Sequence, residues 1–345
     1  MPRLNPLPVR FLPWAQARQR RHIVVDGAAV STTALTLSHW PNNSTPERYR
    51  HETSTETALA WLADHDPRAV ADAVSNNHFD EDGLFAMYAV TAPRAALALA
   101  ALLGDAARTG DFGVYRSRDA ARLCFAIEAH VDPALSPLPR AVLATQGAAR
   151  VVALYQAMLR RLPRLIDELP RLRRLWQAQD AQLDAGEEWL AARRLVIEEE
   201  PALDLAIVRL PEDAEPRTAW RYLRPERAVV HPFVIQSATR CTRLVRLQGR
   251  RIEVQYRYES WLALPSRRPA QRVDLSPLRD WLNRREHHGR WIWENPLDLA
   301  PRLYREHDAP SSLTAAEFLH ALRHALRTQP PVWDAYNWRP PRRTA

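Results

Sequence analysis

The sequence predicts an α/β protein with a three-layer, Rossmann-like N-terminal domain, a helical connector and a smaller C-terminal α+β lobe. Short apolar runs first alternate with helical patterns, helical periodicity then dominates, and a period of two returns from residue 203. We therefore expect an extended lead-in, an α/β domain, a connector, an α+β lobe and a surface tail at residues 1–20, 21–135, 136–200, 201–328 and 329–345.

Two short strands are expected early in the N-terminal domain. Residues 22–27 form an apolar run that ends in Asp26-Gly27, and residues 33–37 alternate polar and apolar side chains and lead to His39. Asp26 could be a metal ligand at a strand end, but Asp-Gly is also a common turn pair, and we favour the turn. His39, before a polar loop, is a second candidate for a functional site.

Capping signals and periodicity predict the helices of this domain. Thr53 and Glu56 form a capping box before a helix over residues 54–63. Two further helices are expected over residues 93–103 and 118–129, with a turn at residues 110–113 between them. Asp111, in that turn, is either a further ligand or a turn residue.

The remainder of the chain is expected to be helical first and β-rich afterwards. Residues 140–195 predict two or three helices interrupted at Pro163 and Pro170. Helices are also expected to begin near Ser276 and Thr314, and the tail from Gln329 is expected to lie on the surface. Strands are predicted over residues 205–210, 229–235, 244–247 and 252–258.

Composition excludes several classes of function. The net charge is +8 and the pI about 10.0, but all 48 basic residues are arginine and they are spread along the chain. This pattern suggests a GC-rich coding bias, so nucleic-acid binding is not favoured. The absence of lysine excludes Schiff-base and ordinary kinase chemistry, and the sequence has no P-loop, Rossmann glycine fingerprint or nucleophile elbow.

The two cysteines, Cys124 and Cys241, are far apart and build no disulfide framework, so a reducing cytoplasm is expected. The first 21 residues lack a signal-peptide apolar region. The most apolar run, residues 95–103, is much too short to span a bilayer, and no membrane partner is expected. The oligomeric state stays open.

The densest chemical signal is His78-x-Asp80-x-Asp82-Gly83. In an extended segment, residues spaced by two project to one face, so the three side chains would face one point at the end of a strand. Two carboxylates with one imidazole suit Mn²⁺ or Mg²⁺, as one or two ions. The spacing excludes an EF-hand, whose glycine comes at the sixth position rather than the fourth. A polar loop with a tight Asp-Gly turn is the alternative.

This motif resembles the first metal motif of the DHH-type phosphoesterases, a superfamily that includes RecJ-like nucleases and manganese pyrophosphatases. Residues 38–40 and the Thr53–Glu56 segment resemble, in degraded form, the Asp-His-His strand end of that family and the helix after it. Only His39 of the three name-giving residues is present, and the order of the motifs is reversed. Either the domain is permuted, or the second resemblance arises by chance.

The resemblance implies a divalent-metal-dependent phosphoesterase acting on a small phosphorylated or nucleotide substrate. His39, His78, Asp80 and Asp82 would be metal ligands, with Asp80 and Asp82 catalytic. Family members close a C-terminal lobe over the metal site, but their glycine-rich substrate motif is absent here. The nearest candidates for phosphate binding are His231, Arg240 and Arg243. Two alternatives stay open: a non-catalytic module that binds a nucleotide or nucleic acid, and a structural protein.

Overall fold

The computed structural model describes residues 8–337, and these fold as two compact units. The first unit is formed by residues up to 181 together with 219–226, and the second by residues 182–218 and from 227 onward. The described residues contain twelve α-helices and four sheets, one of them parallel, which confirms a mixed α/β protein. None of the helices in this part of the chain is long and apolar enough to cross a membrane.

The first unit contains a parallel sheet in which every neighbouring pair of strands runs in the same direction. Its central strands carry apolar side chains, such as Ile23 and Val74, that are fully buried. Parallel strands end at the same edge of a sheet, so the residues that follow them are brought together there. In spatial order the strands are β1 (Arg10–Phe11), β4 (Ala73–Ser75), β2 (His22–Val25) and β3 (Thr33–Leu37).

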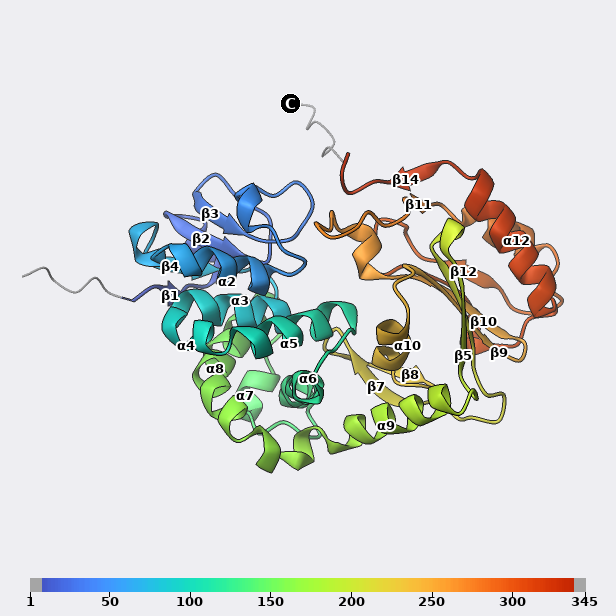
Figure 1. Cartoon of the computed structure of the whole chain (residues 1–345), viewed down its shortest axis with the longest axis horizontal. Coiled ribbons are helices and arrows are strands. Elements are labelled where there is room, and N and C mark those ends of the chain that lie inside the picture. The colour runs from blue at the N-terminus through green and yellow to red at the C-terminus, as the bar shows by residue number, and fades with distance from the viewer. Residues whose placement is uncertain (1–7, 338–345) are drawn as a thin grey trace, which may run out of the picture. The chain divides into compact units, whose positions relative to one another are not determined.

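Helix α3 (Glu81–Thr91) is the central helix of this unit, and every residue from Glu81 to Val90 is buried. A helix buried on all sides must be surrounded by other elements, and α3 contacts β2, β4 and several helices. Figure 1 shows the helical layer beside the sheet. Around α3 lie α2 (Ser54–Asp64), α4 (Pro93–Ala98), α5 (Ala100–Phe112) and α8 (Gly147–Asp167).

Three of the expected helices are confirmed. Thr53 caps α2 by accepting a hydrogen bond from the Glu56 amide, and Thr314 caps the last helix through a complete capping box. Both signals involve residues within one turn of each other, so tertiary contacts had little chance to override them. The helices in question are α2, α6 (Arg118–Val131) and α12 (Ala315–Thr328).

Two predictions around α5 are wrong. The helix expected over residues 93–103 does not end at Gly104, which lies inside α5, where its missing side chain leaves room for Glu56 of α2. The expected turn at residues 110–113 is the last turn of the same helix, and only Gly113 leaves it, with φ of 67°. Glycine inside a helix costs about 1 kcal/mol relative to alanine, but close helix packing overrides that preference here.

The connector contains the expected helices, but its two prolines do not both interrupt a helix as expected. Pro163 lies inside α8 without ending it, while Pro170 lies in a 3₁₀ turn after that helix. The remaining helices of this part are α7 (Arg140–Leu143) and α9 (Gln177–Ala191).

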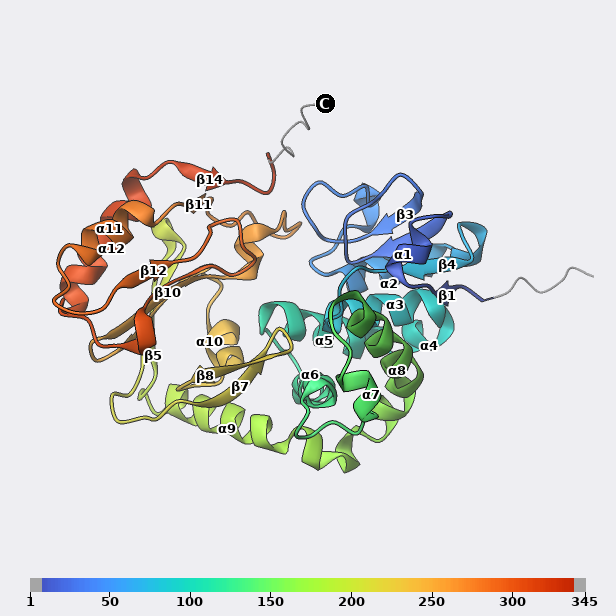
Figure 2. The same ribbon diagram turned by 180° about the vertical axis from the view of Figure 1, so that it is seen from behind.

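The second unit is built on a six-stranded sheet with one parallel pair, β6 with β9, and otherwise antiparallel pairs. Helices α11 (Ser276–Asn283) and α12 pack their apolar side chains, including Leu282 and Phe318, against it to form the core (Figure 2). The strand order is β12 (Trp291–Trp293), β13 (Arg302–Arg305), β10 (Arg251–Tyr256), β9 (Arg243–Gln248), β6 (Leu205–Arg209) and β5 (Val196–Glu200).

The structure corrects the expected strand at residues 229–235. Pro232 begins a helix, α10 (Pro232–Ala238), and His231 caps it by accepting a hydrogen bond from the Phe233 amide. Proline has no backbone N–H group. At the first helical position this donor has no partner within the helix, whereas in a strand its absence would remove a hydrogen bond to the neighbouring strand. Two two-stranded sheets complete the structure: β7 (Arg217–Arg221) with β8 (Arg224–Ala228), and β11 (Arg272–Val273) with β14 (Pro331–Trp333).

Both ends of the described chain are more ordered than expected. The lead-in contributes β1 and helix α1 (Trp14–Ala17), and the tail contributes β14, in which Trp333 is buried. Burial of an indole ring removes a large apolar surface from water and stabilises the folded state. The burial of Trp333 therefore favours packing of this proline-rich tail against the rest of its unit. The parts of these two expectations that fall on residues 1–7 and 338–345 lie outside the described residues.

Candidate metal centre

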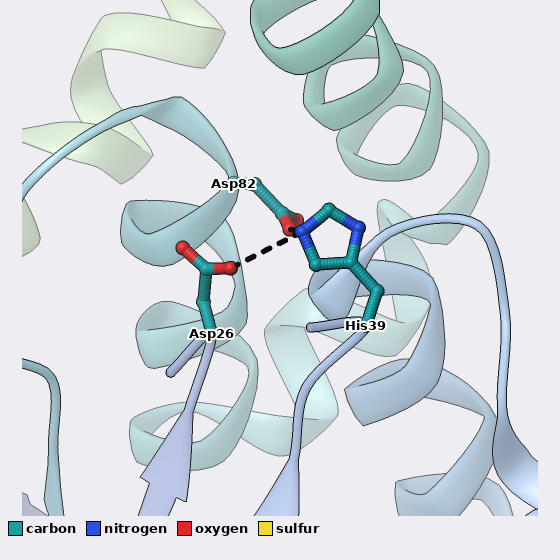
Figure 3. Close-up of side chains that lie close together, drawn as sticks. All are labelled: Asp26, His39 and Asp82. Carbon is teal, nitrogen blue, oxygen red and sulfur yellow. Dashed lines mark ion pairs between the residues drawn. The ribbon is translucent and has the colours of Figure 1, made fainter. Parts of the chain in front are cut away.

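Acidic and imidazole side chains gather at the carboxyl edge of the parallel sheet. Asp26 follows β2, His39 follows β3, and His78 and Asp80 lie in the loop that follows β4. Asp82 reaches the same place from the first turn of α3 (Figure 3). Asp26 has a positive φ of 46°, a backbone conformation that aspartate tolerates better than most residues and that often marks a functional position.

The first group, which we call the inner half-site, contains Asp26, His39 and Asp82, each with a ligand atom within 4.8 Å of the others. His39 Nε2 lies 3.5 Å from Asp26 Oδ1 and 3.8 Å from Asp82 Oδ2. All three side chains are almost completely buried. This half-site is therefore closed to bulk water.

The second group, the outer half-site, contains Asp26, His78 and Asp80. His78 Nε2 lies 3.0 Å from Asp26 Oδ2 and 3.0 Å from Asp80 Oδ2. The side chains of His78 and Asp80 are 33% and 27% exposed, so this half-site reaches the surface. Asp26 belongs to both half-sites and turns a different oxygen toward each.

Hydrogen bonds orient both imidazoles for ligation through Nε2. His39 Nδ1 donates to the backbone oxygen of Glu52 at 2.7 Å, and because a carbonyl only accepts, the neutral ring carries its proton on Nδ1. His78 Nδ1 lies 3.1 Å from Asn77 Oδ1, and its Nε2 lies 3.0 Å from Asp80 Oδ2. Each ring thus directs Nε2 at the shared carboxylate, where Nε2 holds a proton in the metal-free site and would offer its lone pair to a bound ion.

Two of the carboxylates also cap helices. Asp82 accepts from the backbone amides of Ser54 at 2.7 Å and Thr55 at 2.8 Å, at the start of α2. Asp80 accepts from the Gly83 amide at 2.8 Å and is the N-cap of α3. These bonds fix the carboxylates and leave other oxygen lone pairs for a cation.

The titration of the site reflects crowded charge in a buried place. Burial and the charge of Asp26 raise the pKa of Asp82 to about 7. The pKa of Asp26 is held well below its usual range, because the charge of His78 and the interaction with His39 outweigh burial. Burial lowers the pKa of His39, but the carboxylates beside it raise that pKa to about 8. In the metal-free site, protons on these raised-pKa groups offset part of the crowded negative charge, and a bound cation would displace those protons.

The donor set fits a hard divalent cation. Asp26 Oδ2 and Asp111 Oδ2 are buried and accept no hydrogen bond of good geometry within the part of the chain that the structure describes, although each has an imidazole Nε2 within 3.5 Å. Asp111 Oδ2 lies 3.5 Å from His39 Nε2, close to the inner half-site. Buried acceptors without donors are costly, and a metal ion is one group that would satisfy them. These Asp and His side chains could therefore hold a metal ion.

The structure brings all four expected metal ligands, His39, His78, Asp80 and Asp82, into one centre, but not as one extended segment. Strand β4 ends at Ser75, His78 and Asp80 lie in a loop, and Asp82 lies in a helix, so the expected alternation to one face is wrong. The motif consequently divides between the two half-sites.

Asp26 is the ligand that sequence reasoning undervalued, because its Asp-Gly pair also predicts a turn. The signal that could have identified it was its position directly after an apolar strand, next to a second strand that ends in His39. Asp111 was weighed as a ligand or a turn residue, and it lies in a helix beside His39.

The three residues expected to bind phosphate lie in the second unit. His231 is buried and caps α10. Arg240 is exposed, and its backbone oxygen accepts from Arg267. Arg243 is 5% exposed and its guanidinium donates to two backbone oxygens, those of Leu203 and Gln271, so it has a structural role.

Comparison with protein families places this chain. A family model described as "Family of unknown function (DUF6687)" matches residues 7–337, so the chain belongs to that family. No curated protein and no solved structure matches the chain.

Proposed function

We propose that this protein is a divalent-metal-dependent phosphoesterase that acts on a small phosphorylated or nucleotide substrate, with Mn²⁺ or Mg²⁺ held in the inner and outer half-sites. The observation that carries the proposal is the position of Asp26, whose two oxygens face His39 on one side and His78 on the other. A carboxylate shared in this way is suited to bridging two cations, the arrangement that many enzymes use for displacement at phosphorus.

Bound divalent ions would lower the pKa of a water molecule and neutralise charge on the phosphoryl oxygens. The chain's own residues would supply the rest. Asp82, fixed by the α2 amides, and His39, fixed by Glu52, hold the inner half-site rigid and dry. His78 and Asp80 reach the surface, so a phosphoryl group would enter on their side. Asp80 and Asp82 are the proposed catalytic carboxylates.

The resemblance to the DHH-type phosphoesterases supports this proposal. The residues quoted for the resemblance, His39 and the His78–Gly83 motif, follow β3 and β4, the two strands that flank β2 in the parallel sheet, rather than lying in unrelated places. We propose that the first unit is a three-layer, Rossmann-like domain and a permuted, divergent relative of that superfamily. Arg240, which is exposed, remains a proposed phosphate ligand, and two buried free cysteines suit the proposed cytoplasmic setting.

The proposal is tested by metal binding and phosphatase assays on the full chain. Mn²⁺ titration by calorimetry should show binding, and hydrolysis of a panel of nitrophenyl phosphates, nucleotides and pyrophosphate should require Mn²⁺ or Mg²⁺. Asp26→Asn should abolish metal binding and lower kcat at least about a thousandfold, because both half-sites lose a charged ligand. Nucleotide binding without hydrolysis would instead favour a binding module. No response of the wild type to Mn²⁺, Mg²⁺, Co²⁺ or Zn²⁺ would overturn the proposal.

A further inference from the structure

Two buried side chains outside the ligand set, Asn76 and Tyr155, lie against the outer half-site. Asn76 follows β4 directly, and its Oδ1 accepts from the backbone amides of Asn77 at 2.6 Å and His78 at 3.3 Å. Its Nδ2 donates to Tyr155 Oη at 3.1 Å. One amide side chain therefore ties the loop that carries His78 to helix α8.

Tyr155 is a firm anchor for this loop. It is fully buried in α8, and its ring contacts Phe11 of β1 and Phe79, each with a centroid separation of 5.0 Å. Phe79 stands between His78 and Asp80 in the chain. Tyr155 thus holds the loop at two points, through the hydroxyl group at Asn76 and through the ring at Phe79.

The packing around this anchor is tight. A Cβ atom at Gly83 would lie 2.7 Å from Asn76 Nδ2, 2.7 Å from Tyr155 Oη and 3.0 Å from Asp80 Oδ1. Such distances are shorter than real contacts of a methyl group, so these three polar groups occupy all the space above the first turn of α3. Because Asp80 is one of them, the anchor also limits where that ligand can move.

The inner half-site is held by different groups. His39 is oriented by Glu52, Asp82 by the amides of Ser54 and Thr55, and Asp26 by a 2.9 Å hydrogen bond from Ser54 Oγ. None of these hydrogen bonds passes through Asn76 or Tyr155. Apart from Asp26, which both half-sites share, the ligands of the two half-sites therefore have separate supports among the described residues.

We propose that Asn76 and Tyr155 are positioning residues that set the affinity of the outer half-site for its ion while leaving the inner half-site unchanged. This inference rests on the proposed function. Supporting groups beyond the ligands typically change metal affinity by about 10- to 100-fold, and loss of a single hydrogen bond changes an equilibrium by roughly 3- to 10-fold.

The test compares Tyr155→Phe with Tyr49→Phe. Tyr49 is also buried in the first unit and its hydroxyl donates to Asp64 at 3.1 Å, so the control loses a comparable hydrogen bond away from the centre. Mn²⁺ is titrated by calorimetry, and electron paramagnetic resonance distinguishes coupled ion pairs from single ions. His78→Ala identifies the outer binding step.

Tyr155→Phe should weaken the outer step roughly 3- to 10-fold and Asn76→Ala about 10- to 100-fold, with the inner step unchanged and single-ion signals replacing coupled ones. Tyr49→Phe should bind like the wild type. Equal outer affinity in Tyr155→Phe and Tyr49→Phe overturns this inference alone. A wild type that binds only one ion overturns this inference and the two-ion form of the proposed function. A wild type that binds no divalent ion overturns the proposed function as well. If Asn76→Ala fails to fold, Tyr155→Phe still decides.

Discussion

Substituting Gly110 by alanine should destabilise the protein, although Gly110 lies inside helix α5. A Cβ atom there would lie 2.6 Å from Glu81 Cβ and 3.1 Å from Glu81 Cγ. Carbon atoms pack best about 3.5–4.0 Å apart, so α3 and α5 would have to separate by about 1 Å. Overpacking of this kind costs about 1–3 kcal/mol, while alanine gains up to about 1 kcal/mol in helix propensity.

Gly104→Ala in the same helix is the matched control. Its Cβ atom would meet Glu56 Cγ at 3.3 Å rather than a Cβ atom, and the Glu56 side chain is partly exposed, so it can move aside. We expect this variant to be neutral or up to about 1 kcal/mol more stable than the wild type. The two variants should therefore differ by roughly 1–3 kcal/mol in unfolding free energy.

The same displacement should disturb the metal centre. Asp111 follows Gly110 and Asp82 follows Glu81, so moving α3 from α5 moves two acids of the centre. Urea unfolding in the presence of a chelator measures stability, and Mn²⁺ calorimetry measures the site. A Gly110→Ala variant as stable as Gly104→Ala, with unchanged Mn²⁺ affinity, would refute this reasoning about the helix contact.

Three further outcomes are expected. Asp80→Asn should abolish outer-ion binding yet change the melting temperature in chelator by only a few degrees, because asparagine still caps the Gly83 amide; a large loss of apo stability would contradict it. Arg243→Ala should lower the free energy of unfolding by about 1–3 kcal/mol, because two buried backbone carbonyl groups lose their hydrogen-bond donor and a cavity is left. Phosphate binding should not change. Urea unfolding midpoints and a phosphate titration would measure the two effects. The stability of the metal-free protein should fall as pH rises from about 4 to about 8, because the raised pKa values of Asp82 (about 7) and His39 (about 8) make the native state bind more protons than the unfolded state. In melting scans, Mn²⁺ should reduce this dependence of the melting temperature on pH. A melting temperature of the metal-free protein that rises over this pH range would contradict the prediction.

Features that depend on neighbouring residues were determined by the sequence itself. The caps at Thr53 and Thr314 and the β9–β10 hairpin all form between groups close in the chain, so their residue types were sufficient to predict them. The spacing of His78, Asp80 and Asp82 likewise marked the region of the metal centre.

Only the tertiary structure decided how the ligands are divided between the inner and outer half-sites and which residue belongs to both. Asp26 bridges the half-sites because β2 lies between β3 and β4 in the sheet, and strand order is set by packing that no local pattern records. Gly104 and Gly110, which read locally as a helix end and a turn, both lie inside α5, and at Gly110 the neighbouring helix α3 approaches too closely for a side chain. Local propensities amount to about 1 kcal/mol or less per residue, and contacts between distant elements readily exceed them.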